Sequence, residues 1–149
     1  MDESAVGPAE ILRAVGNDSR LRILGLLQGH ELCVCELVDA VGRPHYAVSR
    51  DLAALQNAGL ILERREGSWV YHSIAPLAES DPFLGGLLRL IESRVAHVPA
   101  ARADRERLAR RLALRVEDRC VVGVGDFVSK SAVCLEPFSG GLDGERRDF

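Results

Sequence analysis

The chain lacks the two apolar features that direct proteins into membranes or out of the cell. None of its apolar runs approaches the roughly 20 residues that a membrane-spanning helix needs. The first residues, Met1 to Ser4, are acidic and have neither the basic nor the apolar region of a secretory signal. We therefore expect a cytoplasmic protein without a membrane partner. A chain of 149 residues is long enough for one domain with a buried core.

Lysine is nearly absent and cysteine is sparse. Lys130 is the only lysine, so the other cationic side chains are arginines, which suit bidentate contacts with phosphate or guanine. The net charge of −3 argues only weakly against nucleic acid, because the local charge of one face decides binding. Four cysteines in a reducing compartment do not indicate a disulfide framework, so the thiols remain available for soft ions.

Apolar spacing predicts a mainly α-helical chain with one small β-hairpin. A tight turn at Gly42 and Pro44 separates two of the helices, and Gly67 supplies the hairpin turn. Helix, tight turn, helix and hairpin is the order of a winged helix-turn-helix. Helices are expected over 8–15, 21–27, 32–41, 44–57, 80–98 and, marginally, 102–115, and strands over 60–65 and 69–74.

The helix expected over 80–98 has an apolar face wider than a small core covers. Phe83, Leu87 and Ile91 lie on this face. Together with the helix at 8–15 it is a candidate dimer interface, and packing within its own domain is the alternative. Trp69 and Tyr71 alternate along one strand and therefore share a face, which favours packing of the hairpin on the core.

Three motifs together resemble the ArsR/SmtB family of metalloregulatory repressors. The element Leu32-Cys33-Val34-Cys35 is similar to the trivalent-arsenic signature of its arsenical-resistance branch. The other two motifs are residues 48–52 and 64–71, and the resemblance covers roughly residues 9–76. It implies a homodimeric repressor, without enzymatic activity or an organic cofactor, that binds operator DNA and is released by arsenic(III) or antimony(III). Residues 1–99 would form the DNA-binding and dimerisation domain, and 100–149 a partly ordered C-terminal extension.

The ligand set of such a site is incomplete in the cysteine pair alone. In this branch a third cysteine can follow three positions after the second, but here that residue is Val38. Trivalent arsenic favours three thiolate sulfurs, so we expect Cys120, with Cys134 as the alternative, to join Cys33 and Cys35. On an ideal helix, residues two positions apart are rotated by about 200°. The side chains of Cys33 and Cys35 would then point to nearly opposite faces and could not bind one ion together. Either the helix therefore starts irregularly at the pair, or binding unwinds its first turn.

The DNA contacts are expected on the helix at 44–57 and on the hairpin. An outer helix face and the hairpin arginines are suited to base edges and phosphates. The residues in question are His45, Tyr46, Ser49, Arg50, Arg64 and Arg65. The less specific reading is a solvated helix face and a solvated hairpin tip.

Four alternatives remain open at this stage. With His30 as a fourth ligand, Cys33, Cys35 and Cys120 would suit zinc, cadmium or lead. Oxidation of Cys33 or Cys35 with Cys120 would instead make a redox switch. A thiol enzyme, or a winged helix that only binds a protein partner, would not require the DNA-contact pattern. Glu92 and His97 are too few for the zinc sites that the family places on its dimer helix.

Overall fold

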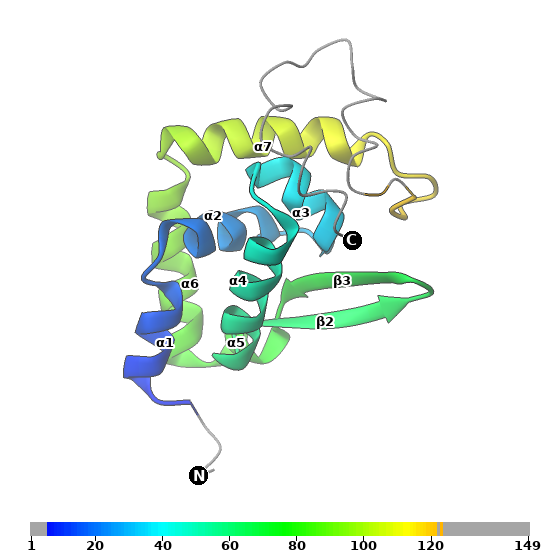
Figure 1. Ribbon diagram of the computed structural model, residues 1–149. Helices are drawn as coiled ribbons and strands as arrows, with labels where there is room; N and C mark the ends of the chain where they lie inside the picture. Colours follow the sequence, from blue (N-terminus) through cyan, green and yellow to red (C-terminus); the bar gives the residue numbers. More distant parts are fainter. Residues whose placement is uncertain (1–5, 122, 124–149) are drawn as a thin grey trace.

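The computed structural model describes residues 6–121 and 123. A helical body carries a β-hairpin that projects from one side (Figure 1). The helices are α1 (Pro8–Val15), α2 (Asp18–Leu27), α3 (Val34–Val41), α4 (His45–Asn57), α5 (Pro76–Ser80), α6 (Pro82–Val95) and α7 (Pro99–Leu112). The strands are β1 (Leu32–Cys33), β2 (Ile61–Glu66) and β3 (Trp69–Ile74). The winged helix-turn-helix order expected from the sequence is confirmed.

The sheet has three strands, whereas the sequence indicated only a hairpin. Strand β3 lies in the middle, between β2 and the two-residue β1, and both pairings are antiparallel. The prediction of a helix from residue 32 was therefore wrong at its start. Leu32 and Cys33 are extended because they pair with His72 and Tyr71 of β3, and the helix begins at Val34.

Helix α4 is held against α2 by a buried carboxylate. Asp51 on α4 accepts hydrogen bonds from the Ser19 hydroxyl at 2.7 Å and from Arg20 at 3.1 Å. Arg43, in the turn before α4, reaches the same carboxylate at 3.2 Å and also contacts the Ser19 hydroxyl. Gly42 makes this turn possible because it adopts a φ of 70°, which favours glycine. The orientation of α4 is thus fixed by polar contacts as well as by its buried apolar stripe.

The bounds of two further helices differ from those predicted. The helix expected from residue 80 begins at Pro82, capped by Asp81, after the separate short helix α5. The helix expected as marginal over 102–115 begins at Pro99 and ends at Leu112. No helix in the described part of the chain is both long and apolar enough to cross a membrane.

Helix α7 lies across α3 and α2 at the top of the molecule (Figure 1). Ala101 and Leu108 join the same hydrophobic core as α1, α2, α3 and α6. Ion pairs supplement this contact: Arg111 donates to Asp39 on α3 at 2.9 Å, and Arg22 on α2 binds Asp104 twice at 2.7 Å. Because α7 is docked in this way, the segment that follows it returns towards the start of α3.

Candidate functional site

The junction of β1 and α3 brings the sulfurs of the cysteine pair together. Cys33 is the N-cap of α3, with an extended backbone at φ −86° and ψ 165°, whereas Cys35 lies in the first helical turn. The helical rotation that would separate the two side chains therefore does not apply. The two Sγ atoms lie 2.9 Å apart. The first of the two expected geometries, an irregular start of the helix, is the one observed.

Cys120 completes a cluster of three thiols. Its Sγ lies 2.9 Å from that of Cys33 and 3.5 Å from that of Cys35. All three side chains are buried, and no other group of three or more possible metal-ligating side chains occurs among the described residues. Cys134, the alternative third thiol, lies outside the described residues. The structure thus brings together the three cysteines that the sequence favoured.

The central strand of the sheet forms the wall of this cluster. Cys33 is paired with Tyr71, and the Tyr71 hydroxyl accepts a hydrogen bond of 2.9 Å from the backbone N–H of Cys120. Trp69, on the same face of β3, is partly buried and packs against the cluster. The shared face expected for Trp69 and Tyr71 is therefore directed at the thiols. It joins the hairpin directly to the site.

Burial and mutual contact raise the pKa of two of these thiols. The pKa of Cys33 is raised far above its usual range, first by the hydrogen bonds with Cys120 and Cys35 and then by burial. The pKa of Cys35 is also raised, mainly by its contact with Cys120 and by burial, although the contact with Cys33 opposes the shift. The pKa values of both cysteines are therefore shifted upward.

Glu36 and Arg115, which were not selected from the sequence, hold the backbone beside the cluster in place. Glu36 is fully buried and accepts the backbone N–H of Cys33 at 3.0 Å. Arg115 binds both carboxylate oxygens of Glu36 at 2.7 Å. The spacing of Cys33 and Glu36 is that of a capping box and was a usable signal. The sequence offered no comparable signal for Arg115, because its partner lies 79 positions away.

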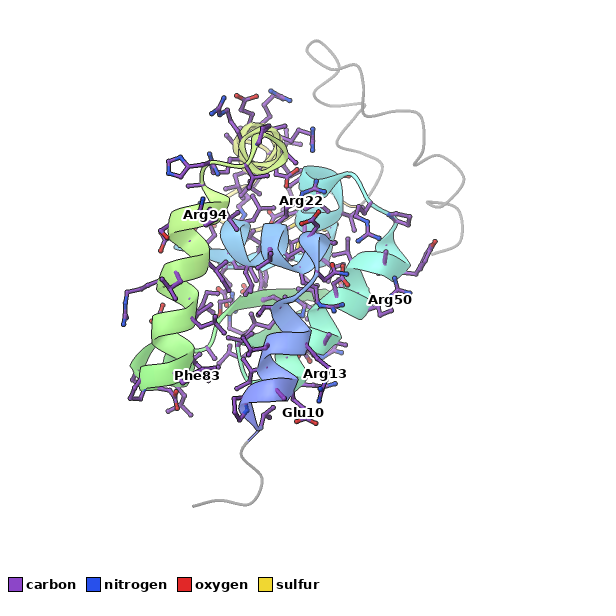
Figure 2. The ribbon with its side chains drawn as sticks, turned by 90° about the vertical axis from the view of Figure 1, so that its left-hand side faces the viewer. Glu10, Arg13, Arg22, Arg50, Phe83 and Arg94 are labelled. Atoms are coloured by element: carbon purple, nitrogen blue, oxygen red, sulfur yellow. The ribbon has the colours of Figure 1, made fainter. Side chains whose placement is uncertain are left out.

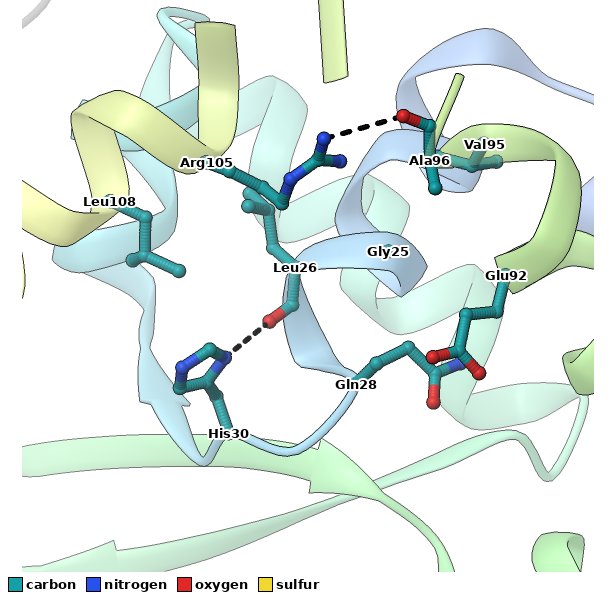
Figure 3. A pocket seen from close by; sticks show the side chains of 9 residues that line it. All are labelled: Gly25, Leu26, Gln28, His30, Glu92, Val95, Ala96, Arg105 and Leu108. Atoms are coloured by element: carbon teal, nitrogen blue, oxygen red, sulfur yellow. Dashed lines mark hydrogen bonds between the residues drawn. The ribbon is translucent and has the colours of Figure 1, made fainter. Parts of the chain in front are cut away.

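His30 does not lie with the thiols. Its Nδ1 is 3.1 Å from the carbonyl oxygen of Leu26, in a separate pocket of about 340 Å³ that Glu92 and Arg105 also line (Figure 3). His30 does not belong to the group of possible metal ligands that the described residues form. The structure therefore does not bring together the four-ligand set considered for zinc, cadmium or lead.

The outer face of α4 is open at the residues expected to contact DNA. Tyr46 is 59% exposed and Arg50 is exposed, whereas His45 and Ser49 are half-buried, with the Ser49 hydroxyl 3.4 Å from His45 Nδ1. Burial lowers the pKa of His45. Figure 2 shows Arg50 on the side of the molecule opposite α6, where Phe83 and Arg94 lie. This face of α4 is therefore not covered by the protein's own core.

The comparisons place these features in a known family. A sequence profile described as "Bacterial regulatory protein, arsR family" matches residues 17–62. An HTH-type transcriptional regulator of Methanocaldococcus jannaschii, MJ1325, is 39% identical over 67 residues, which are 44% of this chain and 75% of that protein. The chain belongs to the arsR family.

Two further proteins show how much of the chain is similar to known regulators in sequence or in structure. The arsenical resistance operon repressor of Escherichia coli is 37% identical over 70 residues, which are 46% of this chain and 60% of that repressor. The structure of HlyU from Vibrio cholerae matches at 27% identity with a TM-score of 0.52, over 62% of this chain and 96% of that one. The family and the relatives named here are described as regulators or repressors, not as enzymes.

The two hairpin arginines of this arsR-family chain differ in their surroundings. Arg64 is bound by Glu31 through two hydrogen bonds of 2.9 Å and by Glu66 at 2.8 Å, and its guanidinium lies 4.9 Å from the centre of the Tyr71 ring. Arg65 is exposed and lines the groove between α4 and the hairpin, together with Ser49. Of the two, Arg65 is the one on the side of α4.

Proposed function

We propose that this arsR-family protein is a transcriptional repressor whose DNA binding is relieved when trivalent arsenic or antimony binds Cys33, Cys35 and Cys120. In this proposal a homodimer holds operator DNA through α4 and the hairpin in the absence of the inducer. The observation that carries the proposal is the buried cluster of three thiols at the N-terminus of α3. The arsenical-resistance name of the Escherichia coli relative supports it.

The composition of the cluster matches the chemistry of trivalent arsenic. Arsenous acid carries three hydroxyl groups, and each can exchange for a thiol: one As–S bond forms, one As–O bond and one S–H bond break, and one water leaves. Three such exchanges use Cys33, Cys35 and Cys120 and release three waters without any net release of protons. Protonated thiols, which burial and mutual contact favour here, are therefore direct reactants.

A divalent cation fits the same cluster less well. Zinc in structural sites takes four ligands, and each thiol must lose its proton to bind it. The described residues supply three ligands, and His30 is hydrogen-bonded elsewhere. The pKa of Cys33 and that of Cys35 are both raised, which adds to the cost of deprotonation. These observations favour a trivalent inducer over zinc, cadmium or lead.

The surface of α4 supports the DNA-binding part of the proposal. Tyr46 and Arg50 are exposed there, and Ser49 lies beside them. Arginine can pair with guanine in the major groove, and hydroxyl groups can reach phosphates or base edges. Arg65 faces the same groove, whereas Arg64 would exchange its Glu31 contact for a phosphate. His45 completes the contact set proposed from the sequence.

Exposed apolar side chains support the homodimer. Leu12 on α1 is 51% exposed, and on α6 Phe83 is 45% and Leu90 68% exposed. Side chains of this size remain on the surface of a monomer singly, but in a dimer their burial contributes to association. A two-fold pair would present two copies of α4 to two half-sites, as DNA readers of this architecture do.

The proposal is tested by titrating sodium arsenite into the reduced protein and following Trp69, the only tryptophan of the chain, which packs against the cluster. We expect a saturable fluorescence change in the parent. Cys33→Ser, Cys35→Ser and Cys120→Ser each remove one As–S bond. Loss of a residue that only supports a metal ligand typically lowers metal affinity by roughly 10- to 100-fold, so loss of a ligand should lower arsenite affinity by at least as much.

Cys134→Ser is the matched control, because it removes a thiol and leaves Cys33, Cys35 and Cys120 in the sequence, and we expect parental affinity. If Cys134→Ser weakens binding and Cys120→Ser does not, the assignment of the third ligand is wrong. If arsenite leaves Trp69 unchanged while hydrogen peroxide changes it, the cluster is a redox switch rather than an arsenic site.

A further inference from the structure

The side chain of Arg115 links the segment that leads to Cys120 with the start of α3. Its Nε and Nη2 bind the two carboxylate oxygens of Glu36 at 2.7 Å each. The same Nη2 donates to the carbonyl oxygen of Glu31 at 2.7 Å. Arg115 therefore holds the chain both before and after the cysteine pair, and these contacts are largely shielded from water.

Glu36 carries this contact to the cysteine pair itself. Its Oε1 accepts from Arg115 and also from the backbone N–H of Cys33. A carboxylate that is fully buried needs such partners, because an unpaired charge is costly there. The guanidinium, the carboxylate and the Cys33 backbone thus form one connected unit.

Five residues beyond Arg115, the chain reaches Cys120. A bridge between Val116 and Arg119 folds this segment back on itself. Its far end is fixed by the hydrogen bond from the Cys120 N–H to the Tyr71 hydroxyl. Arg115 fixes its near end, next to the carbonyl of Glu31. With both ends attached, the Cys120 thiol is aimed at the cysteine pair.

We propose that Arg115 is the positioning residue of the thiol site, and that it brings Cys120 of the same subunit into the ligand set of Cys33 and Cys35. The inference rests on the proposed function, in that arsenite is the ligand. It adds that a residue which touches no ligand controls the third bond. Outer partners of this kind usually contribute about 10- to 100-fold to metal affinity.

The geometry of arginine is necessary for this role. A lysine at this position would keep the charge but offers one ammonium group in place of the planar fork that reaches both oxygens of Glu36 and a carbonyl. Arg119 provides a matched comparison in the same segment. It lies next to Cys120, and its side chain is 63% exposed and bound only loosely to Glu66 at 3.3 Å.

The test compares arsenite binding by Arg115→Gln and Arg119→Gln, followed through Trp69 fluorescence. We expect Arg115→Gln to weaken binding about tenfold or more, because the Cys120 segment loses its near attachment. Arg119→Gln should bind like the parent. X-ray absorption at the arsenic edge should show three sulfur neighbours in the parent and in Arg119→Gln, but two sulfurs and an oxygen in Arg115→Gln.

A second pair of variants separates positioning from a general loss of stability. In a Cys120→Ser background the third bond is already absent, so adding Arg115→Gln should not weaken arsenite binding further. An equal loss in both backgrounds would overturn the inference, and so would parental affinity of Arg115→Gln. If Arg115→Gln does not fold, Arg115→Lys takes its place. It should show a smaller loss that also disappears in the Cys120→Ser background.

These outcomes differ from a failure of the proposed function. If arsenite does not bind the parent protein, arsenic sensing is wrong, whatever Arg115 does. If arsenite binds the parent and Cys120→Ser weakens it while Arg115→Gln does not, the sensing proposal stands and only the positioning role is wrong.

Discussion

The three thiols of the cluster would lose their hydrogens in different ways to arsenous acid and to a divalent cation. Exchange of arsenic hydroxyls for thiols consumes the thiol hydrogens as water, whereas a divalent cation must displace them into solution. Burial and mutual hydrogen bonding raise the pKa of Cys33 and of Cys35, which favours the protonated form of these two thiols. The two ligand classes therefore respond differently to pH.

We predict that the affinity for arsenite is nearly constant between about pH 6 and pH 8, because no net protons are released. The affinity for cadmium should rise with pH over the same range, by up to about tenfold per pH unit for each proton displaced. Isothermal titration calorimetry in buffers of different ionisation enthalpy measures the proton release directly. A steep pH dependence of arsenite binding would mean that the thiols bind as pre-formed thiolates, contrary to this account.

Helix α3 connects the thiol site to α4. Cys33 caps α3 and Cys35 lies in its first turn, while Gly42 and Pro44 lead from its end into α4. A ligand that ties these two cysteines to Cys120 acts on the first turn of α3. The opposite end of α3 is where the orientation of α4 is set, with Asp51 fixing α4 against α2.

We predict that arsenite changes the hydrogen-exchange rates of α3, because the three As–S bonds replace the present contacts between sulfurs and alter the first helical turn. Mass spectrometry of peptides from residues 33–57 measures this. Cys33→Ser with arsenite is the control and should exchange like the ligand-free parent. Equal rates in the parent with and without arsenite would contradict transmission through α3.

The elements also show how far sequence patterns reach. The 3.6-residue periodicity located α1, α2, α4 and α6, and alternation located β2 and β3, since each of these segments buries one side. Strand β1 was missed because its two residues become extended only by pairing with Tyr71 and His72, which lie 38 and 40 positions later. Local periodicity contains no information on such a pairing.

Helix α7 illustrates a second limit. It is rich in arginine and has few apolar positions, so its pattern predicted only a marginal helix. Its docking depends partly on charges that are buried in pairs, Arg111 with Asp39 on α3 and Asp104 with Arg22 on α2. Which arginine meets which carboxylate is a property of the folded chain. The candidate ligands Cys33, Cys35 and Cys120 could be chosen from the sequence, but the residues that position Cys120 could not.

The described residues leave an exposed face on α4 and another on α6. One is the outer face of α4 with Arg50, and the other includes the exposed Phe83 and Leu90 on α6 (Figure 2). The proposal assigns the first to operator DNA and the second to the other subunit. Binding of both partners by one protein, and release of only the DNA, is what regulation by an inducer requires.

Release of operator DNA by arsenite tests directly whether the thiol cluster controls DNA binding. The reduced protein is bound to a fluorescent duplex copied from the region upstream of its own coding sequence, and arsenite is added while anisotropy is followed. We expect release from the parent, no release from Cys33→Ser or Cys120→Ser, and parental release from Cys134→Ser. If the parent stays bound at arsenite concentrations that saturate the Trp69 signal, the thiols bind arsenic without controlling DNA, and the claim is wrong.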